Sequence, residues 1–153
     1  MNLVITPNVR RAIGAVEAFP LAGITYRQLD YWAARGWVKP SIEPGSGRPG
    51  RRLYSPNDVL RLATLGHMGR SGADVGQLGP QMAELKLPTD AADYLVVLEP
   101  DLSLRVVTAA DLRDHVAIPG SYVVFDPAPL RRQLGLCPAL AAGDTRLNEA
   151  RTA

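Results

Sequence analysis

The sequence has few of the residues on which secreted and metal-binding proteins depend. Its 153 residues include a single cysteine, Cys137, which cannot form a disulfide within the chain and fits a reducing cytoplasm. The two histidines, His67 and His115, have no neighbouring Cys, His or carboxylate at the spacing of metal ligands. No apolar run approaches the roughly 18–20 residues that cross a bilayer, and the N-terminus lacks the order of a signal peptide. We therefore expect a cytoplasmic protein without a metal, a cofactor or a membrane contact.

The motifs of common enzymes are also missing. The sequence contains no Gly-rich loop that would cradle phosphates and no nucleophile elbow. Its apolar content of 46% and charged content of 21% are those of an ordinary globular protein that is long enough to bury a core. We therefore predict no catalytic residues and a function other than catalysis.

Charge is unevenly distributed along the chain. Residues 1–86 hold 11 Lys and Arg against 6 Asp and Glu, a net charge of +5, whereas residues 87–153 hold 6 against 9, a net charge of −3. A basic half joined to an acidic half is typical of a nucleic-acid-binding module attached to a module that does not bind nucleic acid.

Residues 25–36 predict a short helix whose two ends are both specified. Thr25 and Gln28 have the spacing of a capping box, in which each side chain bonds the backbone N–H of the other residue. Gly36 is a typical residue just past a helix end. The residues expected to face inward are Leu29, Trp32 and Ala33. The outward face then carries Tyr26, Arg27, Asp30, Tyr31 and Ala34.

A loop rich in glycine, proline and arginine follows this helix. Its arginines are Arg48, Arg51 and Arg52. The apolar pairs at 37–38 and 53–54 flank the loop and predict a two-stranded ribbon with a basic tip. Ser55 then caps a further helix, with Pro56 at its first position and Asp58 at its third.

In this order the features resemble the MerR family of DNA-binding proteins. The resemblance is carried by the helix ITYRQLDYWAARGWVKP, by the loop ending GRRLYS and by the helix that opens at Ser55-Pro56. The wording ITYRQLDYW looks closest to an actinobacterial branch of MerR-like regulators. The resemblance covers about residues 16–80 and implies a winged helix-turn-helix whose first helix spans residues 16–22.

The resemblance also implies a site for duplex DNA on the outward helix face and the loop. Arg27 is expected to reach guanine edges or a phosphate in the major groove, and Arg52 stands where the family has a phosphate-binding arginine. Asp30 is expected to orient Arg27 or another arginine, or to accept a hydrogen bond from a cytosine amino group. The full predicted set is Thr25, Tyr26, Arg27, Gln28, Asp30, Tyr31, Arg48, Arg51, Arg52 and Tyr54.

The acidic half predicts a small second domain. Residues 94–98 and 104–107 read as a β-hairpin, 109–116 as a short helix, 121–125 as a third strand and 129–134 as a last helical turn. This β-β-α-β-α order predicts a small α+β domain with an antiparallel sheet. We therefore expect an α+β protein with a DNA-binding domain at 1–86, the small domain at 87–137 and a tail at 138–153.

Two functions remain open from the sequence. The first is a sequence-specific transcription regulator, with RNA polymerase as a further partner; the second is an excisionase or recombination directionality factor that acts with an integrase. The family usually dimerises through a long coiled-coil helix, but residues 73–87 are too short and too interrupted by glycine and proline for one. We therefore expect a homodimer formed through the domain at 87–137.

Overall fold

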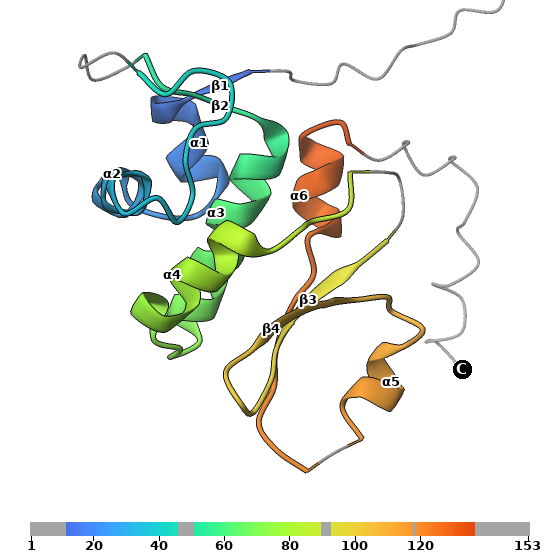
Figure 1. Cartoon of the computed structure of the whole chain (residues 1–153). Helices are drawn as coiled ribbons and strands as arrows, with labels where there is room; N and C mark the ends of the chain where they lie inside the picture. Colours follow the sequence, from blue (N-terminus) through green and yellow to red (C-terminus); the bar gives the residue numbers. More distant parts are fainter. Residues whose placement is uncertain (1–11, 46–50, 90–92, 118, 137–153) are drawn as a thin grey trace, which may run out of the picture.

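The computed structural model describes residues 12–45, 51–89, 93–117 and 119–136 of the chain. It is a mixed α+β structure, as predicted, with a helical part at one end and an antiparallel sheet at the other (Figure 1). The first part contains β1 (Ile13–Gly14), α1 (Ala15–Leu21), α2 (Tyr26–Ala34), β2 (Leu53–Tyr54), α3 (Pro56–Arg70) and α4 (Val75–Glu84). The second part contains β3 (Leu95–Leu98), β4 (Leu104–Val107), α5 (Leu112–His115), β5 (Val123–Phe125) and α6 (Ala128–Gln133). The predicted β-β-α-β-α order is confirmed.

Helix α2 has both of its predicted ends. Thr25 Oγ1 accepts a hydrogen bond from the Gln28 backbone N–H at 3.1 Å, and the Gln28 side chain accepts one from the Thr25 N–H at 2.9 Å. Gly36 follows the C-cap residue Arg35 and has a φ of 76°, which glycine adopts without strain. The residues that face inward are Leu29 and Trp32, which are buried, and Ala33, which is half-buried.

Helix α3 begins as predicted. Ser55 and Asp58 form a second capping box at its first turn. The helix then continues through Gly66 and Gly69 and ends at Arg70. A Cβ at Gly66 would lie 2.5 Å from Ile24 Cγ2, so this glycine allows the segment before α2 to pack closely against α3.

The strand pairing around the basic loop differs from the prediction. Residues 37–38 do not form a strand; β2 instead pairs antiparallel with β1, which places Ile13 opposite Tyr54. A single bridge joins Glu43 to Leu53. The pairing of β1 with β2 connects segments far apart in the chain, and its two-residue strands are too short to show a period-2 pattern.

Residues 71–85 contain one continuous helix, α4. Proline lies inside both α4 and α1, where Pro20 is the last residue but one. Each proline removes the hydrogen bond to the carbonyl four residues earlier. Those earlier residues, Gly76 and Val16, are both exposed, so solvent can satisfy their carbonyls and the helices persist.

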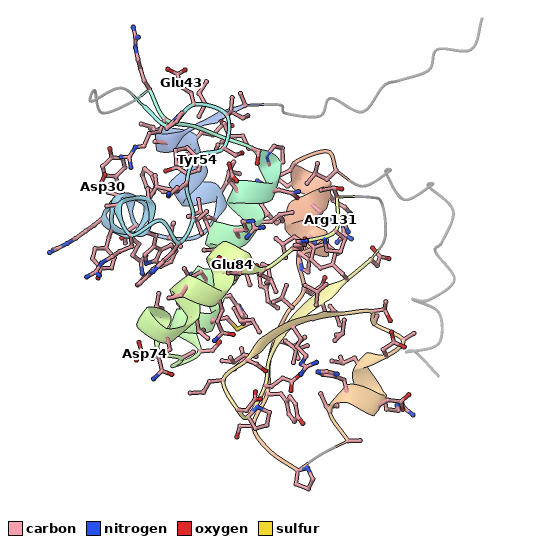
Figure 2. The ribbon with its side chains drawn as sticks, viewed as in Figure 1. Asp30, Glu43, Tyr54, Asp74, Glu84 and Arg131 are labelled. Carbon is pink, nitrogen blue, oxygen red and sulfur yellow. The ribbon has the colours of Figure 1, made fainter. Side chains whose placement is uncertain are left out.

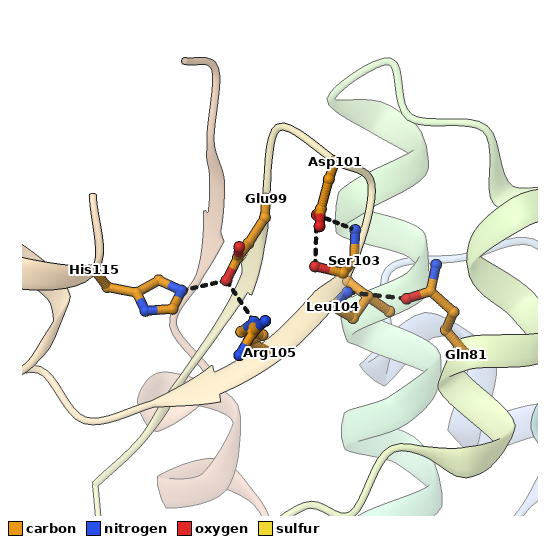
Figure 3. A network of polar contacts seen from close by, with 7 residues as sticks. All are labelled: Gln81, Glu99, Asp101, Ser103, Leu104, Arg105 and His115. Atoms are coloured by element: carbon orange, nitrogen blue, oxygen red, sulfur yellow. Dashed lines mark hydrogen bonds and ion pairs between the residues drawn. The ribbon is translucent and has the colours of Figure 1, made fainter. Parts of the chain in front are cut away.

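The sheet has the strand order β4-β3-β5, and all its pairs are antiparallel. Gln81 of α4 lies beside the start of β4, where its side-chain oxygen accepts from the Leu104 N–H at 3.0 Å (Figure 3). The Gln81 side-chain nitrogen also donates to the Leu102 carbonyl at 2.8 Å. Glu99 at the end of β3 bonds His115 of α5 (Figure 3). These contacts fix the sheet to α4 on one side and to α5 on the other.

One hydrophobic core crosses the predicted boundary at residue 86. Helix α3 packs against both β5 and α6, and the His67 ring lies 5.2 Å from the Phe125 ring. Leu87, at the start of the predicted second domain, is buried in the same cluster. The division into domains at 1–86 and 87–137 stays a prediction, and Cys137 and the predicted tail at 138–153 lie outside the described residues.

Candidate nucleic-acid interface

The outer face of α2 presents aromatic and charged side chains to solvent. Tyr26 and Tyr31 are 39% and 46% exposed, and Arg27 and Asp30 are exposed as well. At 3.6 residues per turn, Arg27 falls in the middle of this face, between Tyr26 and Asp30 on one flank and Tyr31 and Arg35 on the other. The face that we predicted for α2 is therefore formed.

Arg27 makes no hydrogen bond or ion pair with any residue in the described part of the chain. Its planar guanidinium carries five N–H donors that match the acceptor pairs of guanine and phosphate. The expected pairing of Asp30 with Arg27 is not present, because Asp30 bonds a different arginine. Arg27 is therefore available to a ligand.

Arg52 connects the basic loop to α2. Its Nη2 donates to Asp30 Oδ1 at 2.8 Å and to the Tyr26 hydroxyl at 3.2 Å. The Arg52 side chain is only 14% exposed, whereas that of Asp30 is 62% exposed. Figure 2 shows Asp30 on the side of α2 that lies toward β2. Of the roles we expected for Asp30, the structure favours the orientation of another arginine; Arg52, which we expected to bind phosphate, already has its guanidinium engaged.

Tyr54 is a core residue and not part of the exposed surface. Its side chain is fully buried, and its hydroxyl has no partner among the described residues. Burial raises the pKa of the Tyr54 phenol, so the group stays neutral at physiological pH. For Arg52 beside it, burial alone would lower the pKa, but Tyr54, Tyr26 and Asp30 outweigh that effect and raise it. The predicted contact of Tyr54 with DNA is corrected, since a buried hydroxyl does not reach a phosphate.

Asp58 ties both ends of the basic loop to α3. Its Oδ2 accepts from the Ser41 N–H at 2.8 Å, from the Ser41 hydroxyl at 2.6 Å and from the Ser55 N–H at 2.8 Å. Ser41 stands where the loop begins and Ser55 where it ends, so one buried carboxylate holds the base of the loop. Within the loop, Gly45 has a φ of 84°, and a Cβ there would lie 2.9 Å from Arg52 Cγ.

The flank of α2 away from the loop carries Arg35, which the predicted site did not include. The Arg35 guanidinium carbon lies 5.1 Å from the centroid of the Tyr31 ring. Tyr31 in turn meets Trp37 edge to face, with ring centroids 5.6 Å apart. The spacing of Tyr31 and Arg35 is i, i+4, and both lie on the exposed face of a capped helix; that pattern is a signal by which the sequence alone points to this pair.

The remaining predicted residues divide into three groups. Thr25 and Gln28 are exposed, but their side chains are occupied with the cap of α2. Arg51 is exposed beside β2 and stays a candidate for a phosphate contact. Arg48 lies outside the described residues.

Neither a metal site nor a membrane-spanning helix is present in the described ranges of the chain. No group of three or more His, Cys, Asp or Glu side chains in them is placed to hold a metal ion. No helix there is long and apolar enough to cross a membrane.

The sequence of this region matches a known family. Residues 16–77 match the family described as the MerR HTH family regulatory protein. Curated relatives include an uncharacterized HTH-type transcriptional regulator of Mycobacterium bovis and proteins of the same description from two strains of Mycobacterium tuberculosis, each 56% identical over 46 residues. The match covers 30% of this chain and only 20% of each relative. Residues 16–77 are a MerR-type helix-turn-helix region, as the resemblance implied.

Proposed function

We propose that this chain is a DNA-binding transcription regulator in which α2 enters the major groove. The observation that carries the proposal is the position of Arg27, central on an exposed helix face and engaged with no described residue. An arginine in that position can donate to both O6 and N7 of a guanine. Tyr26 and Tyr31 flank Arg27 on the same helix face, and their hydroxyls, together with the exposed Arg51 beside β2, supply donors for phosphates.

The surroundings of Arg27 support this proposal because they are fixed. Two capping boxes set the ends of α2 and α3, and Asp58 holds the base of the loop. The names of the relatives describe transcription regulators, and their match lies within one part of this chain. A homodimer formed through residues 87–137 and contact with RNA polymerase belong to the same proposal; a dimer would place two α2 helices on two half-sites.

Genome-wide mapping of bound DNA, followed by binding assays on the preferred site, tests the proposal. Arg27→Ala should cost about 1–3 kcal/mol on the preferred site and much less on random duplex. Arg113→Ala is the matched control, because Arg113 is an exposed arginine on α5 at the far end of the molecule. Equal losses on both duplexes would show that Arg27 grips only the backbone. No binding by the unmodified chain would contradict the proposal.

The same map separates the two functions that the sequence left open. Sites clustered at promoters support a transcription regulator. Sites confined to recombination attachment sites next to integrase genes support an excisionase instead.

A further inference from the structure

Arg35 stands at the end of a row of two aromatic rings that rests on the backbone of α4. A Cβ at Gly79 would lie 2.0, 2.4 and 2.5 Å from three atoms of the Trp37 ring, so the indole rests directly on the α4 backbone. Trp37 meets Tyr31 at 88°, and the Arg35 guanidinium lies over the Tyr31 ring. The row Gly79, Trp37, Tyr31 and Arg35 thus leads from the inside of the molecule to the outer face of α2.

The contact between Arg35 and Tyr31 leaves the charge of the arginine unbalanced. A cation over a ring face is held by the ring quadrupole and needs no carboxylate. No described residue forms an ion pair with Arg35, which is exposed. The aromatic row therefore limits where the guanidinium lies while its N–H donors remain available to an anion.

We infer that Arg35 binds a phosphate of the DNA backbone and that Trp37 and Gly79 are positioning residues for it. This inference rests on the proposed function and adds a second contact to it. Arg27 and Arg35 are eight residues apart, or about 12 Å along the helix axis. That separation lets Arg27 reach base edges inside the groove while Arg35 reaches the backbone beside it.

The salt dependence of binding to a random duplex tests the contact of Arg35 itself. In the full chain, Arg35→Ala should reduce the slope of log K against log salt concentration by about 0.9, the value for one phosphate contact. Arg35→Lys keeps the charge and should keep the slope, and Arg113→Ala should match the unmodified chain. If the unmodified chain binds DNA and Arg35→Ala keeps its slope, this inference is overturned and the proposed function stands. Absence of any binding by the unmodified chain overturns both.

The role of the stack has a readout that needs no DNA. The Tyr31 ring should shift the Arg35 side-chain proton resonances upfield, and Gly79→Ala should reduce that shift because the added methyl displaces Trp37. Tyr31→Leu lies on the exposed face, so it removes the ring with little effect on the core and should abolish the shift. Tyr31→Phe keeps the ring and should keep both the shift and the Arg35 contribution to the slope. An unchanged Arg35 shift in Gly79→Ala would overturn the positioning role of Trp37 and Gly79, and an unchanged shift in Tyr31→Leu would overturn the contact of Arg35 with the Tyr31 ring.

Discussion

The two flanks of α2 hold an arginine in opposite ways. On the loop side, Arg52 is paired with Asp30 at 2.8 Å and is 14% exposed. On the other side, Arg35 lies over Tyr31 and remains exposed. A guanidinium with its charge balanced and its donors engaged holds the loop against the helix, whereas a stacked one keeps its charge for a ligand. The comparison teaches that the partner of an arginine, and not the number of arginines in a loop, decides which guanidinium keeps its donors available to a ligand.

The largest expected effect comes from removing Asp58, the carboxylate that holds the base of the basic loop. Asp58→Ala removes a 7% exposed carboxylate that accepts from Ser41 and Ser55, and with it one of the two hydrogen bonds of the capping box of α3. We expect the free energy of unfolding to fall by about 2–3 kcal/mol, because two partly buried N–H groups and the Ser41 hydroxyl lose a charged acceptor. Urea denaturation of Asp58→Ala and of Asp58→Asn, which keeps one carbonyl acceptor, measures the effect. A midpoint that does not move in Asp58→Ala would show that other contacts hold the loop.

The features of the fold that could be predicted from the sequence are those that depend on residues close together in the chain. The caps at Thr25–Gln28 and Ser55–Asp58 depend on residues three apart, so the sequence displays them directly. The short apolar runs at 94–98 and 104–107, with a turn at 99–101 between them, likewise predict the hairpin of β3 and β4, which pair in register from Leu95–Val107 to Leu98–Leu104. These local patterns therefore locate α2, the helix that carries the candidate site.

The parts that could not be predicted depend on contacts between distant residues. Arg52 and Asp30 are 22 residues apart, and no local pattern tells that they pair. Residues 37–38 are apolar and therefore resemble a strand in the sequence. In the structure, Trp37 instead packs on Gly79 of α4, a contact between distant residues. Which arginine is free and which is engaged is a tertiary property, so the candidate site could be located but its members could not be assigned.

An intermediate effect is expected when Arg52 is released from its ion pair with Asp30. Asp30→Asn removes the charge that holds Arg52, and the stability cost should be no more than about 1 kcal/mol because Asp30 is largely exposed. Affinity for random duplex should rise, since a negative charge near the phosphates is lost and Arg52 gains freedom to reach them. The salt slope should increase by about 0.9 if Arg52 takes a phosphate. Fluorescence anisotropy at several salt concentrations measures both; a loss of affinity on the preferred site alone would favour contact of Asp30 with a cytosine.

The smallest effect is expected at Tyr54, the buried tyrosine of β2. Tyr54→Phe removes a buried hydroxyl that has no partner among the described residues, so stability should stay the same or rise by up to about 1 kcal/mol. DNA affinity should not change, in contrast to the contact expected from the family. Because burial raises the pKa of Tyr54, its contribution to stability is present below about pH 10 and is lost as the pH rises toward the raised value. Between about pH 8 and 11, the unfolding midpoint should therefore fall less steeply with rising pH in Tyr54→Phe than in the unmodified chain. The ordinary pKa of a tyrosine is ~10.

The salt slope of DNA binding, measured together with the free energy of unfolding, compares the two flanks most directly. The two proteins are Arg35→Ala and the double variant Asp30→Ala/Arg52→Ala, which removes an ion pair and so leaves the net charge unchanged. We predict that Arg35→Ala lowers the slope by about 0.9 with little change in stability. The double variant should keep the slope and lose stability, because it removes the link between the loop and α2. A double variant that loses the slope, beside an Arg35→Ala variant that keeps it, would contradict the account.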